Sequence, residues 1–268
     1  MNIAKQIKSL TDQIKTLEKV TIAVSGGIDS MVLSYLAHQA IGTDAQMVHA
    51  TSAAVPKLDT KRVTDYTKKY GWNLKLVETG EMNKEEYLKN PVNRCYHCKT
   101  CLYSTLNALN FGQVLSGTNL DDLSDYRPGL IAAKENNVVH PYVDNKIDKN
   151  SIRAIARYYQ LDDLSDLPAS PCLSSRVETG VYILPDQLAL INDVESMIRK
   201  TIQTENIRCR FLSQQLLIEI DSDTLALLSD VEKETVTQQT QFLAASHKVN
   251  LPVQMAQYQR GSAFVGAV

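Results

Sequence analysis

The chain has 268 residues, 44% hydrophobic and 22% charged, a balance typical of a folded globular protein rather than a disordered one. Its 28 lysines and arginines are offset by 30 aspartates and glutamates, which argues against nucleic acid as a partner because there is no overall positive field. No apolar run approaches the roughly 20 residues that cross a bilayer, so we expect a cytoplasmic protein with no membrane partner.

The first part of the chain alternates helix-like and strand-like segments. Apolar residues spaced three and four apart predict an amphipathic helix over residues 1–17, and a β-branched run follows at 20–24. After a glycine turn, residues 31–39 have helical spacing. Further apolar runs at 46–50, 74–77 and 114–116 are separated by helix-like stretches at 57–70, 84–89 and 95–109. This alternation predicts a doubly wound parallel sheet of the α/β class.

The rest of the chain predicts a smaller α+β domain. We expect a helix over 151–159 and a proline-containing loop over 162–179, and we place a boundary near Gly180, giving domains 1–180 and 181–268. Beyond it we expect helices at 186–202 and 224–243 and strands at 206–212, 216–220 and 249–258.

The glycine turn after the first strand has the composition of a phosphate-binding loop. Ser25-Gly26-Gly27-Ile-Asp29-Ser30 lacks the Lys-Ser/Thr ending of a Walker loop and the spaced glycines of a dinucleotide loop. Adjacent glycines let successive N–H groups converge on an anion, and the following helix directs its positive end toward it. Asp29 is a candidate Mg²⁺ ligand. An ordinary glycine turn with a polar helix cap is the competing interpretation.

This hexapeptide resembles the loop of the PP-loop ATP pyrophosphatases, which adenylylate a substrate oxygen and release pyrophosphate. The resemblance implies ATP as the nucleotide. Because these proteins include synthetases of NAD, GMP and asparagine as well as tRNA-thiolating enzymes, the loop indicates only a type of reaction.

Four of the five cysteines are candidates for metal ligands or reactive thiols rather than disulfides, because we expect a reducing compartment. Cys95 and Cys98 are three residues apart, Cys101 continues the spacing, and Cys172 follows a proline near Arg176, whose guanidinium could stabilise a thiolate. The competing interpretation is buried, inert cysteine, which is the one we expect for the fifth, at position 209.

Three or four thiolates can hold an iron–sulfur cluster or a tetrahedral zinc, and spacing does not separate the two. If the cysteines serve to deliver sulfur, an iron–sulfur cluster is favoured over zinc, because three protein thiolates leave one iron open to carry an extra sulfide. A fourth ligand at Cys101 would close that iron.

Segments along most of the chain together resemble the LarE family of ATP-dependent sulfur transferases, which thiolate the pyridinium dicarboxylate mononucleotide precursor of the nickel-pincer cofactor. These segments are residues 25–30, 116–129, 168–176, 207–210 with Glu219, and 258–262. In the single-cysteine branch, the position matching Cys172 gives up its own sulfur. A second branch with a Cys-x-x-Cys pair resembles this chain more closely and holds a 4Fe-4S cluster at the positions matching Cys95, Cys98 and Cys172.

The resemblance also implies roles for further residues. ATP would contact Ser25, Gly26, Gly27, Asp29, Ser30, Gly117, Asp125 and Arg127, with Mg²⁺ at Asp29. The mononucleotide substrate would contact Arg176, Arg208, Arg210 and Arg260, since guanidinium forks suit phosphate and carboxylates, with Glu195 and Glu219 binding a metal or orienting the arginines. Solvated surface charges are the competing interpretation. The resemblance further implies a homo-oligomer built through the C-terminal domain.

Two departures from the family pattern concern the cysteines and their loop. The family commonly follows Ser-Ser-Arg with a proline-tyrosine-glycine turn where this chain has Val177-Glu-Thr-Gly180, and Cys101 is outside the pattern.

Together these patterns predict an enzyme that transfers AMP from ATP to a substrate carboxylate and then replaces an oxygen by sulfur from Cys172 or the cluster. A tRNA-thiolating enzyme, an ammonia-using amide synthetase and a non-catalytic, zinc-stapled nucleotide-binding module remain the alternatives.

Overall fold

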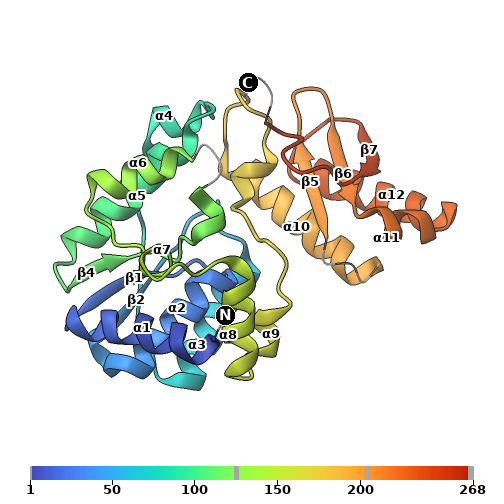
Figure 1. Cartoon of the computed structure of the whole chain (residues 1–268). Coiled ribbons are helices and arrows are strands. Elements are labelled where there is room, and N and C mark those ends of the chain that lie inside the picture. The colour runs from blue at the N-terminus through green and yellow to red at the C-terminus, as the bar shows by residue number, and fades with distance from the viewer. Residues whose placement is uncertain (1, 124–126, 203, 205, 265–268) are drawn as a thin grey trace. The chain divides into compact units, whose positions relative to one another are not determined.

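The computed structural model describes residues 2–123, 127–202, 204 and 206–264 (Figure 1). Within them, a parallel sheet of four strands forms the centre of the first part of the chain, in the order β3-β2-β1-β4. The strands are β1 (Val20–Ala23), β2 (Ala45–Ala50), β3 (Asn73–Val77) and β4 (Gln113–Leu115). The predicted parallel α/β sheet is confirmed.

Helices cover both faces of this sheet because alternate side chains of a strand point to opposite faces. Met47 and Leu115 enter one apolar core, whereas their neighbours Val48 and Val114 enter another. The first core is formed with α1 (Ile3–Thr16), α2 (Ile28–Ile41), α3 (Lys57–Tyr70), α7 (Pro141–Asp144), α8 (Lys149–Tyr158) and α9 (Asp162–Ser165). The second is formed with α5 (Arg94–Ala108) and α6 (Pro128–Glu135) on the opposite face (Figure 1).

The second sheet, in the C-terminal part of the chain, has the order β5-β6-β7. Strands β5 (Ile207–Phe211) and β6 (Leu216–Ile220) are antiparallel, and β7 (Val253–Gln257) is parallel to β6. α10 (Pro185–Ile202) contacts β5, and α12 (Asp230–Ser246) contacts both α10 and β7. The smaller α+β region is therefore present as predicted.

The single helix predicted over 224–243 is wrong. The structure has two helices there, α11 (Ser222–Leu227) and α12. Ser229 begins α12 with a capping box, in which its hydroxyl accepts from the Glu232 N–H while the Glu232 carboxylate accepts from the Ser229 N–H. The cap provides hydrogen-bond acceptors for amides that a continuous helix would have bonded internally, so a new helix begins after Ser229.

Contacts divide the chain into two compact units. Unit 1 comprises Met1–Glu81 and Cys95–Ser170, and unit 2 comprises Met82–Arg94, which includes α4 (Glu85–Leu88), and Pro171–Val268. The division of the chain into domains at Gly180 stays a prediction. Among the described residues, no helix is both long and apolar enough to cross a membrane.

Candidate active site

The predicted phosphate loop joins β1 to α2 and is closed by its own hydrogen bonds. The Ser25 N–H donates to Ser30 Oγ at 3.0 Å, and that hydroxyl donates to the Gly27 carbonyl at 3.0 Å. Gly27 is the N-cap of α2 and has no side chain with which to bond the amides of the first turn. The positive end of α2 therefore faces the loop with backbone amides suited to a phosphate.

Gly26 and Gly117 are glycines because backbone passes close to each of them. Gly26 has φ +90°, and a Cβ there would lie 2.7 Å from Asp59 Cβ. A Cβ on Gly117 would lie 2.8 Å from Ser30 N. The segment after β4 and the first turn of α3 thus pack directly against the phosphate loop, and neither contact has room for a side chain.

Asp29, the predicted Mg²⁺ ligand, lies in the first turn of α2 and already has cationic and amide partners. Lys149 Nζ is 2.5 Å from its Oδ2, and Asn119 Nδ2 donates to its Oδ1 at 3.2 Å. The hydroxyl of Tyr142 donates to the Asp29 carbonyl oxygen at 3.0 Å. Sequence reasoning did not single out Lys149 or Asn119; only the resemblance of residues 116–129 pointed toward Asn119.

The remaining predicted ATP contacts follow β4. Arg127 forms an ion pair with Asp122 at 2.7 Å, and Asp122 also accepts the Asn119 N–H at 3.1 Å. This carboxylate therefore joins Arg127 to the segment that positions Asn119 beside Asp29. Asp125 lies outside the described residues.

The backbone around Cys172 is held by buried donors of unit 2. Arg176, 1% exposed, donates from Nη1 to the carbonyls of Pro171 at 2.5 Å and Cys172 at 3.1 Å. Arg94 Nη1 donates to the Ser174 carbonyl at 2.8 Å. The Cys172 side chain itself is partly exposed. Buried side chains thus bond the loop backbone at and around Cys172, and the cysteine itself is not fully buried.

The charged residues predicted to bind substrate are, with one exception, buried in unit 2, which excludes the solvated-surface interpretation for them. Arg176 makes a two-pronged ion pair with Glu195, from Nε to Oε1 at 2.9 Å and from Nη2 to Oε2 at 3.2 Å. Arg210 Nε donates to Glu219 at 2.8 Å. The exception is Arg260, which is exposed.

Burial and charge act in opposite directions on this cluster. Burial disfavours the Glu195 carboxylate, but Arg176, Arg199 and Arg208 outweigh it, so the pKa of Glu195 is below its ordinary value. Burial, together with the like charge of Arg176, lowers the pKa of Arg208, whose guanidinium lies 5.6 Å from the ring centroid of Tyr258. The Glu195 carboxylate is therefore ionised at neutral pH and pairs with the buried Arg176 guanidinium.

The cysteine pair lies at the start of α5, in unit 1. Cys95 is exposed, and Cys98 and Cys101 are partly exposed. In the described part of the chain, no three His, Cys, Asp or Glu side chains are gathered into a group that could hold a metal ion. Cys95 and Cys98 belong to unit 1 and Cys172 to unit 2, and the 4Fe-4S cluster on these three residues stays a prediction. Cys209 is fully buried, as expected, and burial raises the pKa of its thiol.

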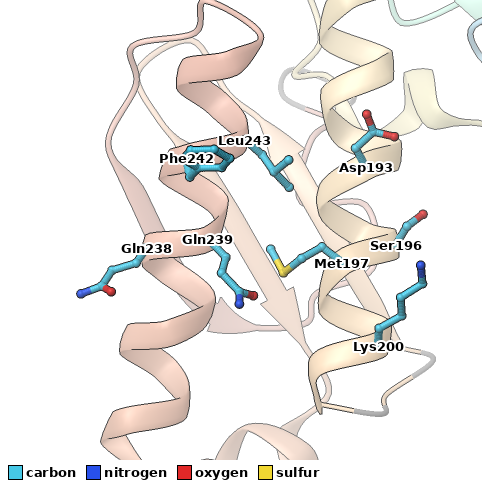
Figure 2. Close-up of a pocket in the computed structure, with 8 residues that line it drawn as sticks. All are labelled: Asp193, Ser196, Met197, Lys200, Gln238, Gln239, Phe242 and Leu243. Carbon is cyan, nitrogen blue, oxygen red and sulfur yellow. The ribbon is translucent and has the colours of Figure 1, made fainter.

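A surface cavity of about 540 Å³ lies between α10 and α12 (Figure 2). It is lined by Asp193, Ser196, Met197, Lys200, Gln238, Gln239, Phe242 and Leu243. It contains no cysteine and no residue predicted from the sequence as part of the site, so we do not assign the chemistry to it.

Three proteins with similar sequences indicate the class to which this chain belongs. An uncharacterized protein of Synechocystis is 34% identical over 223 residues, covering 82% of each chain. The pyridinium-3,5-bisthiocarboxylic acid mononucleotide synthase of Lactiplantibacillus plantarum is 28% identical over 223 residues, 81% of this chain and 80% of its own. A subunit of the glutamine-hydrolysing GMP synthase of Saccharolobus solfataricus is 23% identical over 209 residues, 70% of this chain and 57% of its own. No protein-family model matches the chain.

The parallel sheet, the glycine loop on the positive end of α2 and these relatives define an ATP-using enzyme of the PP-loop class. Within that class, the chain belongs to the LarE family.

Proposed function

We propose that the chain is an ATP-dependent sulfur transferase that converts a carboxylate of pyridinium-3,5-biscarboxylic acid mononucleotide into a thiocarboxylate. The observation that carries the proposal is the phosphate loop closed on the positive end of α2, with the Asp29–Lys149 pair beside it. The substrate is inferred from the product for which the Lactiplantibacillus relative is named, and the partly exposed Cys172 would supply the sulfur atom.

In the first step, the loop amides and Lys149 hold the phosphates while a substrate carboxylate oxygen attacks the α-phosphorus. The bond from that phosphorus to the pyrophosphate oxygen breaks, leaving an acyl adenylate and pyrophosphate. Positive charge from Lys149 and the α2 dipole stabilises the departing pyrophosphate. Mg²⁺, held by Asp29, would add charge neutralisation at the same phosphates.

In the second step, the Cys172 thiolate attacks the acyl carbon, the carbon–oxygen bond to AMP breaks, and a thioester forms. Loss of the Cys172 α-proton with cleavage of its Cβ–S bond then leaves the substrate thiocarboxylate and dehydroalanine. Arg176 and Arg94 contribute by fixing the loop backbone. If Cys95, Cys98 and Cys172 held a 4Fe-4S cluster, the cluster would instead supply a sulfide, and Cys172 would keep its sulfur atom.

Metal and mass analysis decide between these two donors. If a cluster operates, anaerobically purified protein contains iron and sulfide, and Cys172 keeps its mass after turnover. If the thiol is the donor, the peptide containing Cys172 loses the elements of H₂S. Zinc in place of iron would favour the alternative of a non-catalytic nucleotide-binding module with a structural zinc site.

We expect Cys172→Ala to retain ATP-dependent adenylylation and to lose sulfur incorporation completely, because the acyl adenylate forms before the thiol is used. Pyrophosphate release and thiocarboxylate formation, measured in parallel, check both steps. Cys101→Ala is the matched control and should retain both. Sulfur incorporation by Cys172→Ala, or loss of adenylylation alone, would contradict the role given to this residue.

We further propose that residues 1–180 form the domain that binds and activates ATP, and that residues 181–268 form the domain that binds the mononucleotide. The second domain would also form the subunit contacts of a cytoplasmic homo-oligomer. Arg208 and Arg210 in the second domain, with Arg176 near the end of the first, carry buried guanidinium groups of the kind that suits the phosphate and carboxylates of that substrate.

A further inference from the structure

Asp59, in the first turn of α3, is buried against the phosphate loop. Arg62 Nη1 lies 2.7 Å from Asp59 Oδ1 and donates to the Gly26 carbonyl oxygen at 2.8 Å. Together with the close approach of Gly26 to the Asp59 backbone, this ties the phosphate loop to the Asp59–Arg62 pair through two separate contacts.

The other carboxylate oxygen of Asp59 holds a second segment. Oδ2 accepts a hydrogen bond from Ser170 Oγ at 3.0 Å. Ser170 is the last residue of unit 1 and is two residues before Cys172 along the chain. Arg153 Nη2 anchors the same segment by donating to the Leu167 carbonyl at 2.9 Å. One carboxylate therefore bonds both to the phosphate loop's partner and to the segment leading to the thiol.

We propose that Asp59 is a positioning residue that couples nucleotide binding at the phosphate loop to the order of the segment leading to Cys172. A polyphosphate immobilises Gly26, and therefore also Arg62 and Asp59, so the Ser170 hydroxyl has a fixed acceptor and the segment opens less often. The inference rests on the proposed function, because it requires ATP at this loop.

Hydrogen exchange of the full chain, measured by mass spectrometry with and without MgATP, tests the coupling. The two informative peptides cover residues 24–30 and 167–176. In the wild-type protein we expect MgATP to slow exchange in both, the second by about fivefold, which is the effect of one ordinary hydrogen bond. In Ser170→Ala we expect the first peptide to respond as before and the second not to respond.

Two variants serve as controls. Ser9→Ala removes another exposed hydroxyl that joins distant segments of unit 1, through its 2.6 Å bond to Asn145 Oδ1, and should behave as wild type. Ser170→Thr keeps the hydroxyl on an exposed residue and should restore the response. An equal response of the second peptide in Ser170→Ala, or no response there in a wild-type chain whose first peptide is protected, would overturn the coupling. A first peptide indifferent to MgATP in the wild type would instead contradict the proposed function, and the coupling with it.

Discussion

Replacing Gly26 by alanine is expected to weaken ATP binding by about a hundredfold, because the added Cβ displaces the phosphate loop from its working geometry. The overlap with Asp59 involves its Cβ, Cα and carbonyl oxygen, at 2.7 to 2.9 Å, and none of these is the end of a flexible side chain. With the left-handed backbone at this position, we expect a loss of about 3 kcal/mol in the free energy of unfolding. Calorimetric titration of MgATP and denaturant unfolding measure the two effects.

Gly71→Ala is the matched control for this variant. Gly71 has a left-handed backbone, with φ 69° and ψ 36°, but an added Cβ meets no atom within 4 Å. It should therefore show only the backbone strain, of about 1 kcal/mol, and normal ATP binding. Wild-type ATP affinity in Gly26→Ala would show that the loop does not bind the nucleotide as proposed.

Glu195→Gln is expected to destabilise unit 2 by about 3 kcal/mol, because it leaves the buried Arg176 guanidinium without its counter-charge. Glu195 is 2% exposed and also accepts from Arg199 and from the Cys209 N–H. Denaturant unfolding followed by a signal from unit 2 measures the loss. Glu234→Gln makes the same change on the exposed face of α12 and should be neutral.

The pH dependence of the same variant provides an independent check. The pKa of Glu195 is lower in the folded protein than its ordinary value of 4.5, so its stabilising contribution is present above that value and is lost as pH falls through the folded pKa. The difference in stability between wild type and Glu195→Gln should therefore shrink in acid. A difference that stays constant below pH 4.5 would assign the loss to packing rather than charge.

Local sequence signals were sufficient to predict the sheet and the phosphate loop. The strand, glycine pair and helix around Gly26 are contiguous, and their backbone requirements are visible in the residues themselves. The capping box at Ser229 is also local, but the continuous helical spacing around it favoured a single helix.

Contacts between residues far apart in the sequence could not be predicted from local signals. Lys149 reaches Asp29 across 120 residues, and Ser170 reaches Asp59 across 111. The crossover connections of the sheet bring these residues together, and no pattern of residue spacing in the sequence predicts the two contacts. Arg176 was predicted as a substrate contact from the family resemblance and the chemistry of its guanidinium, whereas its pairing with Glu195 depends on how α10 packs on the loop.

The most direct test of the central claim is to incubate the chain with MgATP and pyridinium-3,5-biscarboxylic acid mononucleotide and to analyse nucleotides and products by mass spectrometry. We predict AMP and pyrophosphate together with a product in which sulfur has replaced one carboxylate oxygen. Formation of ADP and phosphate, or an adenylylated substrate that never acquires sulfur, would contradict the assignment.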